Sequence, residues 1–176
     1  GPEQIANALK KGMMAFNDFE KRVKENGTEV VRGLNPDEKA FVIISKTYGV
    51  ADPTLNMGIP DKLMEMGYQV ISFYDLPEGD ISEEHPNMYW PFGQHILEAA
   101  QVVKQHPNLY AIFLTHHGCG PDTVFTHYFK EIMGDKPYLN IEVDEHSSGV
   151  GVVTRIEAFI NSLSKICLIS HRLIKR

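Results

Sequence analysis

Short apolar runs that alternate with helical patterns constrain the fold of this chain more than any other feature. A short continuous apolar run covers residues 40–45, and further strands are expected over residues 68–74, 109–115 and 136–143. Runs of this length are typical of strands that are buried on both faces of a parallel sheet. Because a helical pattern separates each run from the next, right-handed crossovers are expected to join the strands. The sequence therefore predicts an α/β fold, a three-layer Rossmann-like domain with a parallel sheet of four or more strands.

An amphipathic helix is expected before the first strand. Apolar residues recur at helical spacing over residues 3–25, and a turn-rich connector follows over residues 26–39. Later helices are expected over residues 58–67, 92–106, 121–134 and 147–163. The chain thus divides into an N-terminal helix with its connector, residues 1–35, and a Rossmann-like α/β domain, residues 36–176.

Charge and cysteine content argue against several classes of protein. The chain carries 17 Lys and Arg against 23 Asp and Glu, a net charge of −6, whereas a nucleic-acid surface needs a basic face. No apolar run is long enough to span a bilayer, so we expect neither nucleic acid nor a membrane as partner. Two cysteines are too few for a disulfide framework, which favours a cytoplasmic location. The opening Gly1-Pro2, without a methionine, suggests a piece of a longer protein.

Four polar segments are expected to meet at one edge of the sheet. They follow the four strands and comprise residues 45–58, the loop that begins at Asp75, residues 116–122 and residues 144–149. In open parallel sheets, ligands bind outside the carboxyl ends of the strands. The topology therefore predicts a functional site built from segments that are far apart in the sequence.

Cys119 is the central candidate at this edge. It lies between Gly118 and Gly120, and glycines permit a tight turn and the close approach of another group. The N-terminus of the following helix carries partial positive charge, which favours a thiolate that can ligate a metal or act as a nucleophile. The alternative is that Cys119 is only a small turn residue. Cys167 lies in an apolar helical stretch and is expected to be a core residue.

The neighbours of Cys119 leave several interpretations open. His116 and His117 are adjacent at a strand end, so their side chains are expected to point in opposite directions and at most one to face the site. Asp122 falls in the first turn of the predicted helix, where a carboxylate stabilises the helix dipole. This role at the start of the helix is the favoured interpretation of Asp122.

The segment after the fourth strand carries a second group of candidates. Asp144, Glu145 and His146 stand at the strand end, where a carboxylate can orient a histidine or hold a cation. Together with His116 or His117 they would suit a metal-dependent hydrolase, and mixed nitrogen, oxygen and sulfur ligands would suit zinc. The spacing matches no helical or Cys-x-x-Cys ligand pattern, so this interpretation is the less favoured one.

The start of the last helix can serve structure or ligand binding. Ser147 or Ser148 is expected to cap it. The glycine-rich junction that includes Gly149 can also cradle a phosphate on backbone N–H groups. Arg155 is either a partner for a phosphate or carboxylate or a surface residue of the helix.

Three of these segments together resemble a known protein family. They are residues 56–70, the turn of residues 117–122, and residues 136–163, which contain Asp-Glu-His and Thr-Arg-Ile-Glu-Ala-Phe. They are similar to the CoA-substrate-specific enzyme activases, also described as 2-hydroxyacyl-CoA dehydratase activator-related proteins. The similarity covers residues 41–163 and lies outside the actin-like ATPase of that family, in the region similar to cluster-bearing subunits of 2-hydroxyacyl-CoA dehydratases.

The resemblance implies a role in electron transfer or acyl-CoA dehydration. In that family, ATP hydrolysis is coupled to low-potential electron transfer, and the dehydratase-like part holds an iron–sulfur cluster on cysteines. The implied metal ligands are Cys119 and His117. The implied catalytic residues are Asp144, Glu145 and His146, and the implied cofactor-binding residues are Cys119, Gly118, Gly120, Ser148, Gly149 and Arg155. An acyl-CoA is a further expected ligand.

The sequence departs from the family in two respects. Family members often carry Gly-Arg-Pro-Tyr-His after the first strand of this region, whereas here only Tyr48 is retained and a basic charge lies at Lys46. A cluster also needs several thiolates, so other domains of a longer parent protein, or another subunit, are the expected partners. The isolated chain is expected to be inactive, and whether it is an enzyme stays open. A non-catalytic domain that binds CoA or a nucleotide, or pairs with a subunit, is the main alternative.

Overall fold

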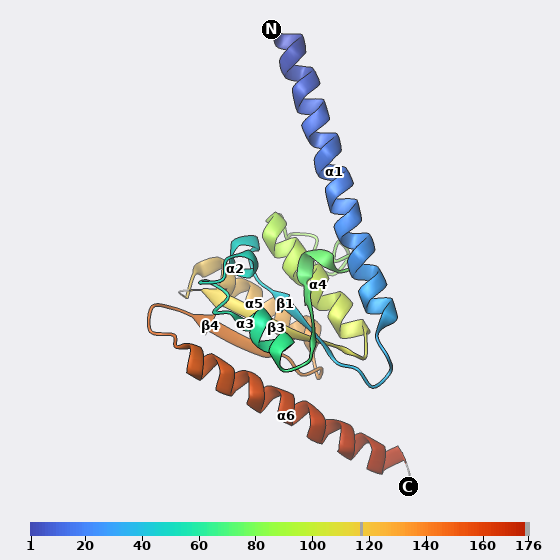
Figure 1. Ribbon diagram of the computed structural model, residues 1–176, viewed down its shortest axis with the longest axis vertical. Helices are drawn as coiled ribbons and strands as arrows, with labels where there is room; N and C mark the ends of the chain where they lie inside the picture. The colour runs from blue at the N-terminus through green and yellow to red at the C-terminus, as the bar shows by residue number, and fades with distance from the viewer. Residues whose placement is uncertain (117, 175–176) are drawn as a thin grey trace.

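A four-stranded parallel sheet forms the centre of the structure. The structure is a computed structural model that describes residues 1–116 and 118–174, with side chains as far as residue 164. The strands are β1 (Ala40–Ile44), β2 (Gln69–Ser72), β3 (Leu109–His116) and β4 (Leu139–Val143). Neighbouring strands pair in parallel in the order β2-β1-β3-β4 (Figure 1). Every residue of β1 is buried, as expected for a central strand between two layers of helices.

Helices cover both faces of the sheet and produce the three layers that the sequence predicts. Short segments α2 (Thr47–Ala51) and η1 (Phe73–Asp75) follow β1 and β2. One face packs against α4 (Pro91–Gln105) and α5 (Gly120–Met133), and the other against α3 (Ile59–Glu65) and α6 (Gly149–Ile174) (Figure 1). No described helix combines the length and the apolar character needed to cross a membrane.

Alternate residues of β1 enter two separate hydrophobic cores. Val42 and Ile44 pack with the apolar side chains of α4 and α5, whereas Phe41 and Ile43 pack with those of α3 and α6. This division follows from the strand geometry, since successive side chains point to opposite faces of a sheet. Both faces of the sheet are therefore closed, and the carboxyl edge is left for a site.

The N-terminal helix is longer than the sequence predicts. α1 (Pro2–Gly33) continues eight residues past the expected end at residue 25, so the expectation of a connector from residue 26 is wrong. The Asn-Gly pair at residues 26–27 is typical of a turn, but Gly27 is buried inside the helix. A Cβ atom at Gly27 would lie 1.6 Å from the backbone oxygen of Asp75. The glycine therefore permits close contact between α1 and η1 rather than ending the helix.

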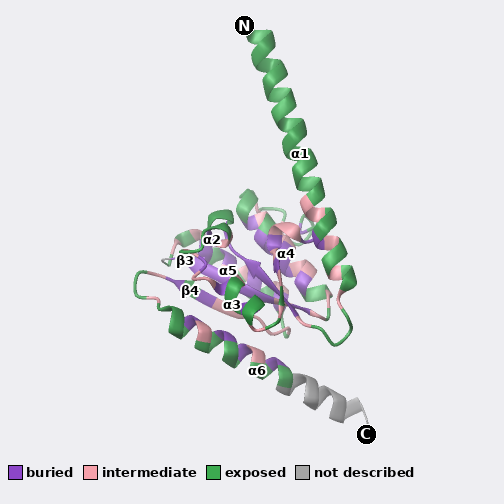
Figure 2. Cartoon of the chain, viewed as in Figure 1, coloured by how far each residue is buried: buried purple, intermediate pink, exposed green. Residues whose placement is uncertain are grey.

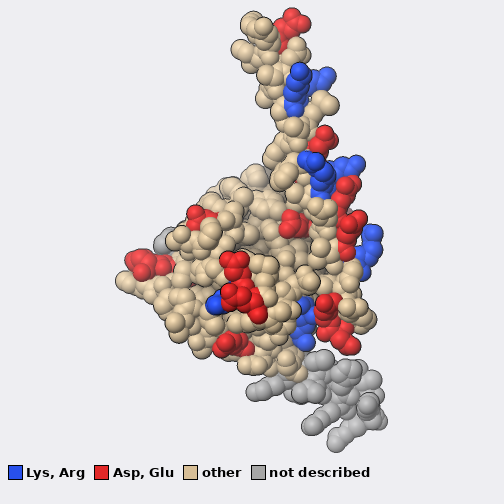
Figure 3. Space-filling model, viewed as in Figure 1, with Lys and Arg blue, Asp and Glu red and all other residues tan. Residues whose placement is uncertain are grey.

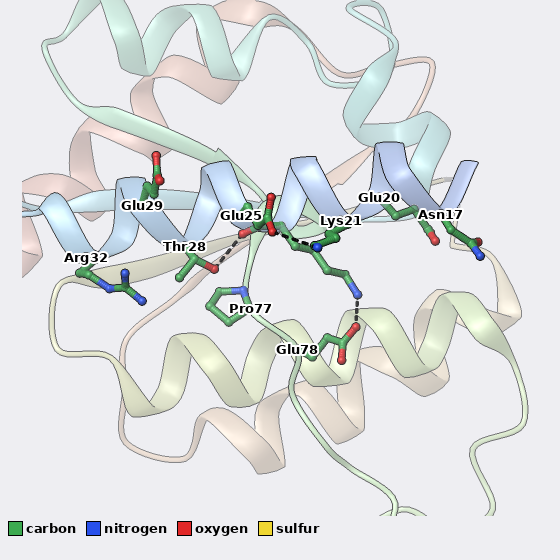
Figure 4. Close-up of a pocket in the computed structure, with 10 residues that line it drawn as sticks. Asn17, Glu20, Lys21, Glu25, Thr28, Glu29, Arg32, Pro77 and Glu78 are labelled. Atoms are coloured by element: carbon green, nitrogen blue, oxygen red, sulfur yellow. Dashed lines mark hydrogen bonds and ion pairs between the residues drawn. The ribbon is translucent and has the colours of Figure 1, made fainter. Parts of the chain in front are cut away.

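Within the described part of the chain, the residues of α1 that are at least partly buried begin at Val23. Lys24 forms an ion pair with Glu78 across the groove between α1 and the segment that follows η1 (Figure 4). The Thr28 hydroxyl donates a hydrogen bond to the Lys24 carbonyl at 2.7 Å. Residues 1–22 are all exposed, and this half of the helix extends away from the domain (Figure 2).

Candidate functional site

The connections leave β1 and β3 in opposite directions, which opens a site between the ends of these two strands. The chain passes from β1 to β2 on one side, then crosses back over β1 to form β3 on the other side. At such a switch point a crevice forms at the carboxyl ends of the strands, and ligands of open parallel sheets bind there. Lys46 lies two residues after the end of β1, and Cys119 lies three residues after the end of β3. The expected convergence of segments at the carboxyl edge is present for these two residues.

Lys46 and Asp122 form a buried ion pair at this switch point. Lys46 Nζ lies 2.8 Å from Asp122 Oδ2, and the two side chains are 10% and 4% exposed. Asp122 Oδ2 also accepts a hydrogen bond from the backbone N–H of His116 at 2.9 Å. The ion pair therefore ties the end of β1 to the end of β3 and to the first turn of α5.

The sulfur of Cys119 belongs to the same cluster. Lys46 Nζ lies 3.2 Å from Cys119 Sγ, and the backbone N–H of Asp122 donates to the sulfur at 3.5 Å. Cys119 is the N-cap residue of α5, so its sulfur occupies the place of a capping oxygen. Gly118 has a φ of 55°, in the left-handed region that favours glycine, and turns the chain between β3 and this cap. The sulfur consequently faces an ammonium group and the N-terminus of a helix, both of which are electropositive.

Lys46 stays charged although its side chain is largely buried. Burial lowers the pKa of Lys46, but its hydrogen bonds with Asp122 and Cys119 and its contact with Tyr48 raise the pKa more, to a value above the ordinary one. The Tyr48 ring centroid lies 5.5 Å from Nζ. Because the net shift is upward, the ammonium form persists at neutral pH and keeps a positive charge at the carboxyl ends of β1 and β3.

Buried polar contacts hold the strand ends in place around this cluster. The Ser45 hydroxyl donates to the Leu114 carbonyl at 2.8 Å, and His116 Nε2 lies 3.2 Å from the Leu55 carbonyl. His116 is only 3% exposed, so its ring belongs to the fold beneath the surface of the site. A Cβ atom at Gly49 would lie 2.5 Å from both His116 Cε1 and Ser45 Oγ, so only glycine fits there. His117, its neighbour, lies outside the described residues.

The predicted candidates after β4 form a self-contained turn at the same edge of the sheet. Asp144 Oδ1 accepts hydrogen bonds from the Ser147 hydroxyl and from the His146 backbone N–H, both at 3.0 Å. The hydrogen bond from Ser147, and then the one from His146, lower the pKa of Asp144 below its usual range. Glu145 Oε1 and His146 Nε2 are 3.7 Å apart on highly exposed side chains. The turn lies beside the Cys119 segment, because Val143 pairs with His116 in the sheet.

The residues expected to bind a cofactor at the start of α6 have structural partners. Ser148 Oγ accepts a hydrogen bond from the Gly151 N–H at 3.2 Å and so caps α6, as predicted for Ser147 or Ser148. Arg155 Nη2 donates to the Asn140 carbonyl on the edge strand β4 at 2.7 Å. Gly149 and Gly120 each begin a helix, α6 and α5 respectively. Binding of a phosphate by this segment stays a prediction.

A complete metal or cluster site does not fit the described part of the chain. Among the described residues, no three His, Cys, Asp or Glu side chains lie where they could hold one metal ion together. An iron–sulfur cluster is normally held by several cysteine thiolates. Cys119 is free, and Cys167 belongs to the part of α6 whose side chains are not described. The site therefore offers one sulfur ligand in an electropositive setting.

Two charged residues of the site were not identified as functional from the sequence. Asp122 does lie in the first turn of α5, as predicted, but its burial and its bond to Lys46 are tertiary features. One feature of the sequence could have pointed to Lys46. It is a single charged residue after a run that predicts a buried strand, and charged residues are rarely buried unless they are paired. Buried charges in proteins are normally paired, so such a lysine predicts a carboxylate partner without identifying it.

Comparison with known proteins supports the resemblance on independent grounds. Residues 1–76 match the family model described as "CoA enzyme activase uncharacterised domain (DUF2229)". No curated protein matches the chain at a significant level. The matched range contains α1, β1 and Lys46 but ends before Cys119. The resemblance to CoA enzyme activases is thereby confirmed, and the chain carries a CoA enzyme activase domain over those residues.

Proposed function

We propose that this chain acts as the dehydratase-like domain of a CoA enzyme activase-related protein and supplies one cysteine ligand to an iron–sulfur cluster. The observation that supports this proposal is the placement of Cys119 Sγ at the switch point of the sheet, 3.2 Å from Lys46 Nζ. The remaining ligands come from cysteines in other domains of the parent protein or in another subunit. The isolated chain is accordingly inactive in acyl-CoA dehydration.

The residues around Cys119 have distinct roles in this proposal. Lys46 offsets the negative charge that a thiolate-bound cluster brings to the crevice, and hydrogen bonds to cluster sulfurs tune the reduction potential. Asp122 holds Lys46 in place through the 2.8 Å ion pair, so it is a positioning residue. When bound, such a cluster supplies one-electron transfer.

Metal and sulfide analysis of the anaerobically purified protein tests the proposal. The protein is prepared with its partner domains or subunit present, as wild type, Cys119→Ser and Cys167→Ser. The two variants make the same chemical change, so Cys167→Ser is the matched control. We expect iron and sulfide in the wild type and in Cys167→Ser, and loss of both in Cys119→Ser. Retention of iron by Cys119→Ser would refute the assignment of Cys119 as a ligand.

The second candidate function is the binding of an acyl-CoA or nucleotide without catalysis. The fixed positive charge of Lys46 in a crevice at the switch point favours it, because phosphate groups bind to such charges. A ligand that binds only the folded state stabilises it by about 2.7 kcal/mol at a concentration of 100 Kd. Titration with acetyl-CoA would therefore raise the melting temperature, and the absence of any shift at saturating concentration would rule this candidate out for that ligand.

A further inference from the structure

The exposed half of α1 carries an apolar stripe that no other part of the described chain covers. Residues 1–22 are all exposed, and Ile5, Leu9, Phe16 and Phe19 remain 55–70% exposed. Charged side chains lie along one side of the protruding helix (Figure 3). Soluble monomers rarely expose a contiguous apolar patch larger than a few hundred Å². In proteins, most of the stability of a helix comes from the packing of its amphipathic face, and this stripe has no packing partner within the described chain.

We propose that this face of α1 binds the same face of a second copy of the chain, with the two helices antiparallel. The stripe consists of Pro2, Ile5, Leu9, Gly12, Phe16 and Phe19. Its spacings alternate between three and four residues, which is the a and d pattern of a coiled coil. The order of spacings is the same when read from either end. An antiparallel pair of identical helices therefore places every stripe residue opposite another stripe residue.

The symmetric register gives well-matched side-chain layers. With the two-fold axis between residues 10 and 11, Ile5 lies opposite Phe16 of the second copy, and Leu9 lies opposite its Gly12. A Cβ atom at Gly12 would meet nothing within 4 Å in the single chain, so the fold of one copy gives no reason for this glycine. Glycine in a helix interior destabilises the helix relative to alanine. Opposite Leu9 of a second copy, the missing side chain leaves room for close packing.

The residues that flank the stripe favour the same arrangement. In this register, Ala6 lies beside Met13 of the second copy, and Ala8 lies beside its Ala15. None of these four side chains is charged, so these two pairs place no like charges opposite one another. The charged residues of the helix tip, Glu3, Lys10, Lys11 and Asp18, fall on the outer face.

The exposed apolar area of the stripe supplies more than half of the area that a standard interface buries on each partner. Five large side chains of α1, Ile5, Leu9, Met13, Phe16 and Phe19, are each more than half exposed. At roughly 100 Å² each they provide about 500 Å² of apolar surface per copy, towards the ~800 Å² per partner of a standard interface. A groove of about 470 Å³ continues the stripe between α1 and the domain, lined by Phe16, Phe19 and Phe73 among others. In this register Pro2 of the second copy lies opposite Phe19, which lines the groove.

Measurement of the molar mass in solution tests the proposal. Light scattering coupled to gel filtration is applied to the whole chain over a dilution series, as wild type, Leu9→Asp and Met14→Asp. Met14 is 57% exposed on the same helix but lies off the stripe, so Met14→Asp adds the same charge as a matched control. We expect a dimer for the wild type and for Met14→Asp, and a monomer for Leu9→Asp. A monomeric wild type at all concentrations, or a dimer that Leu9→Asp leaves intact, would overturn the proposal.

The register is tested separately by exchanging charges across the interface. Ile5→Lys and Phe16→Glu should each give a monomer as single variants. The double variant should dimerise again, because each new lysine faces a new glutamate only in the antiparallel register. A double variant that stays monomeric would overturn the pairing of Ile5 with Phe16. Circular dichroism of each variant shows whether the domain remains folded, which the exposed position of these residues predicts.

Discussion

Replacement of Lys46 by methionine is expected to destabilise the fold by about 3 kcal/mol, because it leaves the carboxylate of Asp122 buried without its cation. The ion pair is 2.8 Å long and its side chains are 10% and 4% exposed, so solvent cannot replace the lysine fully. Removal of one partner of such a pair typically costs about 3–5 kcal/mol. The lower figure applies because Asp122 keeps its hydrogen bond from the His116 N–H. For a chain of this size, the loss corresponds to a fall in melting temperature of roughly 6–12 °C.

Urea denaturation of four variants measures this effect and separates it from the effect of a lost surface charge. Lys46→Met is compared with Asp122→Asn and with the double variant, which removes both charges and should be more stable than Lys46→Met. Lys62→Met is the matched control, since Lys62 forms a 2.6 Å pair with Glu65 on exposed side chains. Exposed pairs contribute less than about 1 kcal/mol. A cost for Lys46→Met no larger than that for Lys62→Met would refute the reasoning, as would a double variant that is no more stable than Lys46→Met.

Three further predictions concern positions outside the Lys46 cluster. Burial, and to a smaller extent the charge of Lys104, lower the pKa of Lys136 to about 8, which is below its pKa in the unfolded chain. Between pH 8 and about pH 10 the folded state therefore binds fewer protons than the unfolded state. Stability should therefore rise with pH across this range, and melting curves should show a smaller rise for Lys136→Gln. Gly27→Ala should displace α1 from Asp75 and speed tryptic cleavage within α1, whereas Gly33→Ala, with open space around its Cβ position, should not. Ser148→Ala should cost about 1 kcal/mol of unfolding free energy, because it removes the cap of α6, and chemical denaturation would detect this loss.

The fold was predictable in outline because its strands and helices carry strong local patterns. Residues 40–44 are apolar throughout and form β1, which is buried on both faces. Pro121 lies in the first turn of α5 and Gly134 follows its end, as helix boundaries require. The end of α1 was not predictable, since Gly27 has the local character of a turn. Only the position of Asp75 explains why the helix needs a glycine there.

The location of the site in the fold could be predicted from the sequence, but the set of residues that form it could not. Any chain with this alternation of strands and helices brings its loops to the carboxyl edge, so Cys119 could be singled out from its position alone. Its contact with Lys46 joins residues 73 positions apart, and no local pattern encodes such a pairing. For the same reason, Asp122 has the local features of an ordinary residue at the start of a helix, although it is the buried partner of Lys46.

The sequence by itself thus determined the alternating elements, the parallel sheet, the edge that bears the site and the apolar stripe of α1, because hydrophobic periodicity is a local property of the chain. The tertiary structure alone decided the strand order, and with it the switch point between β1 and β3. That order places Lys46, Cys119 and Asp122 within hydrogen-bonding distance of one another. The physical reason is that contacts between distant segments depend on how the layers pack, and packing is a property of the whole chain rather than of any one segment.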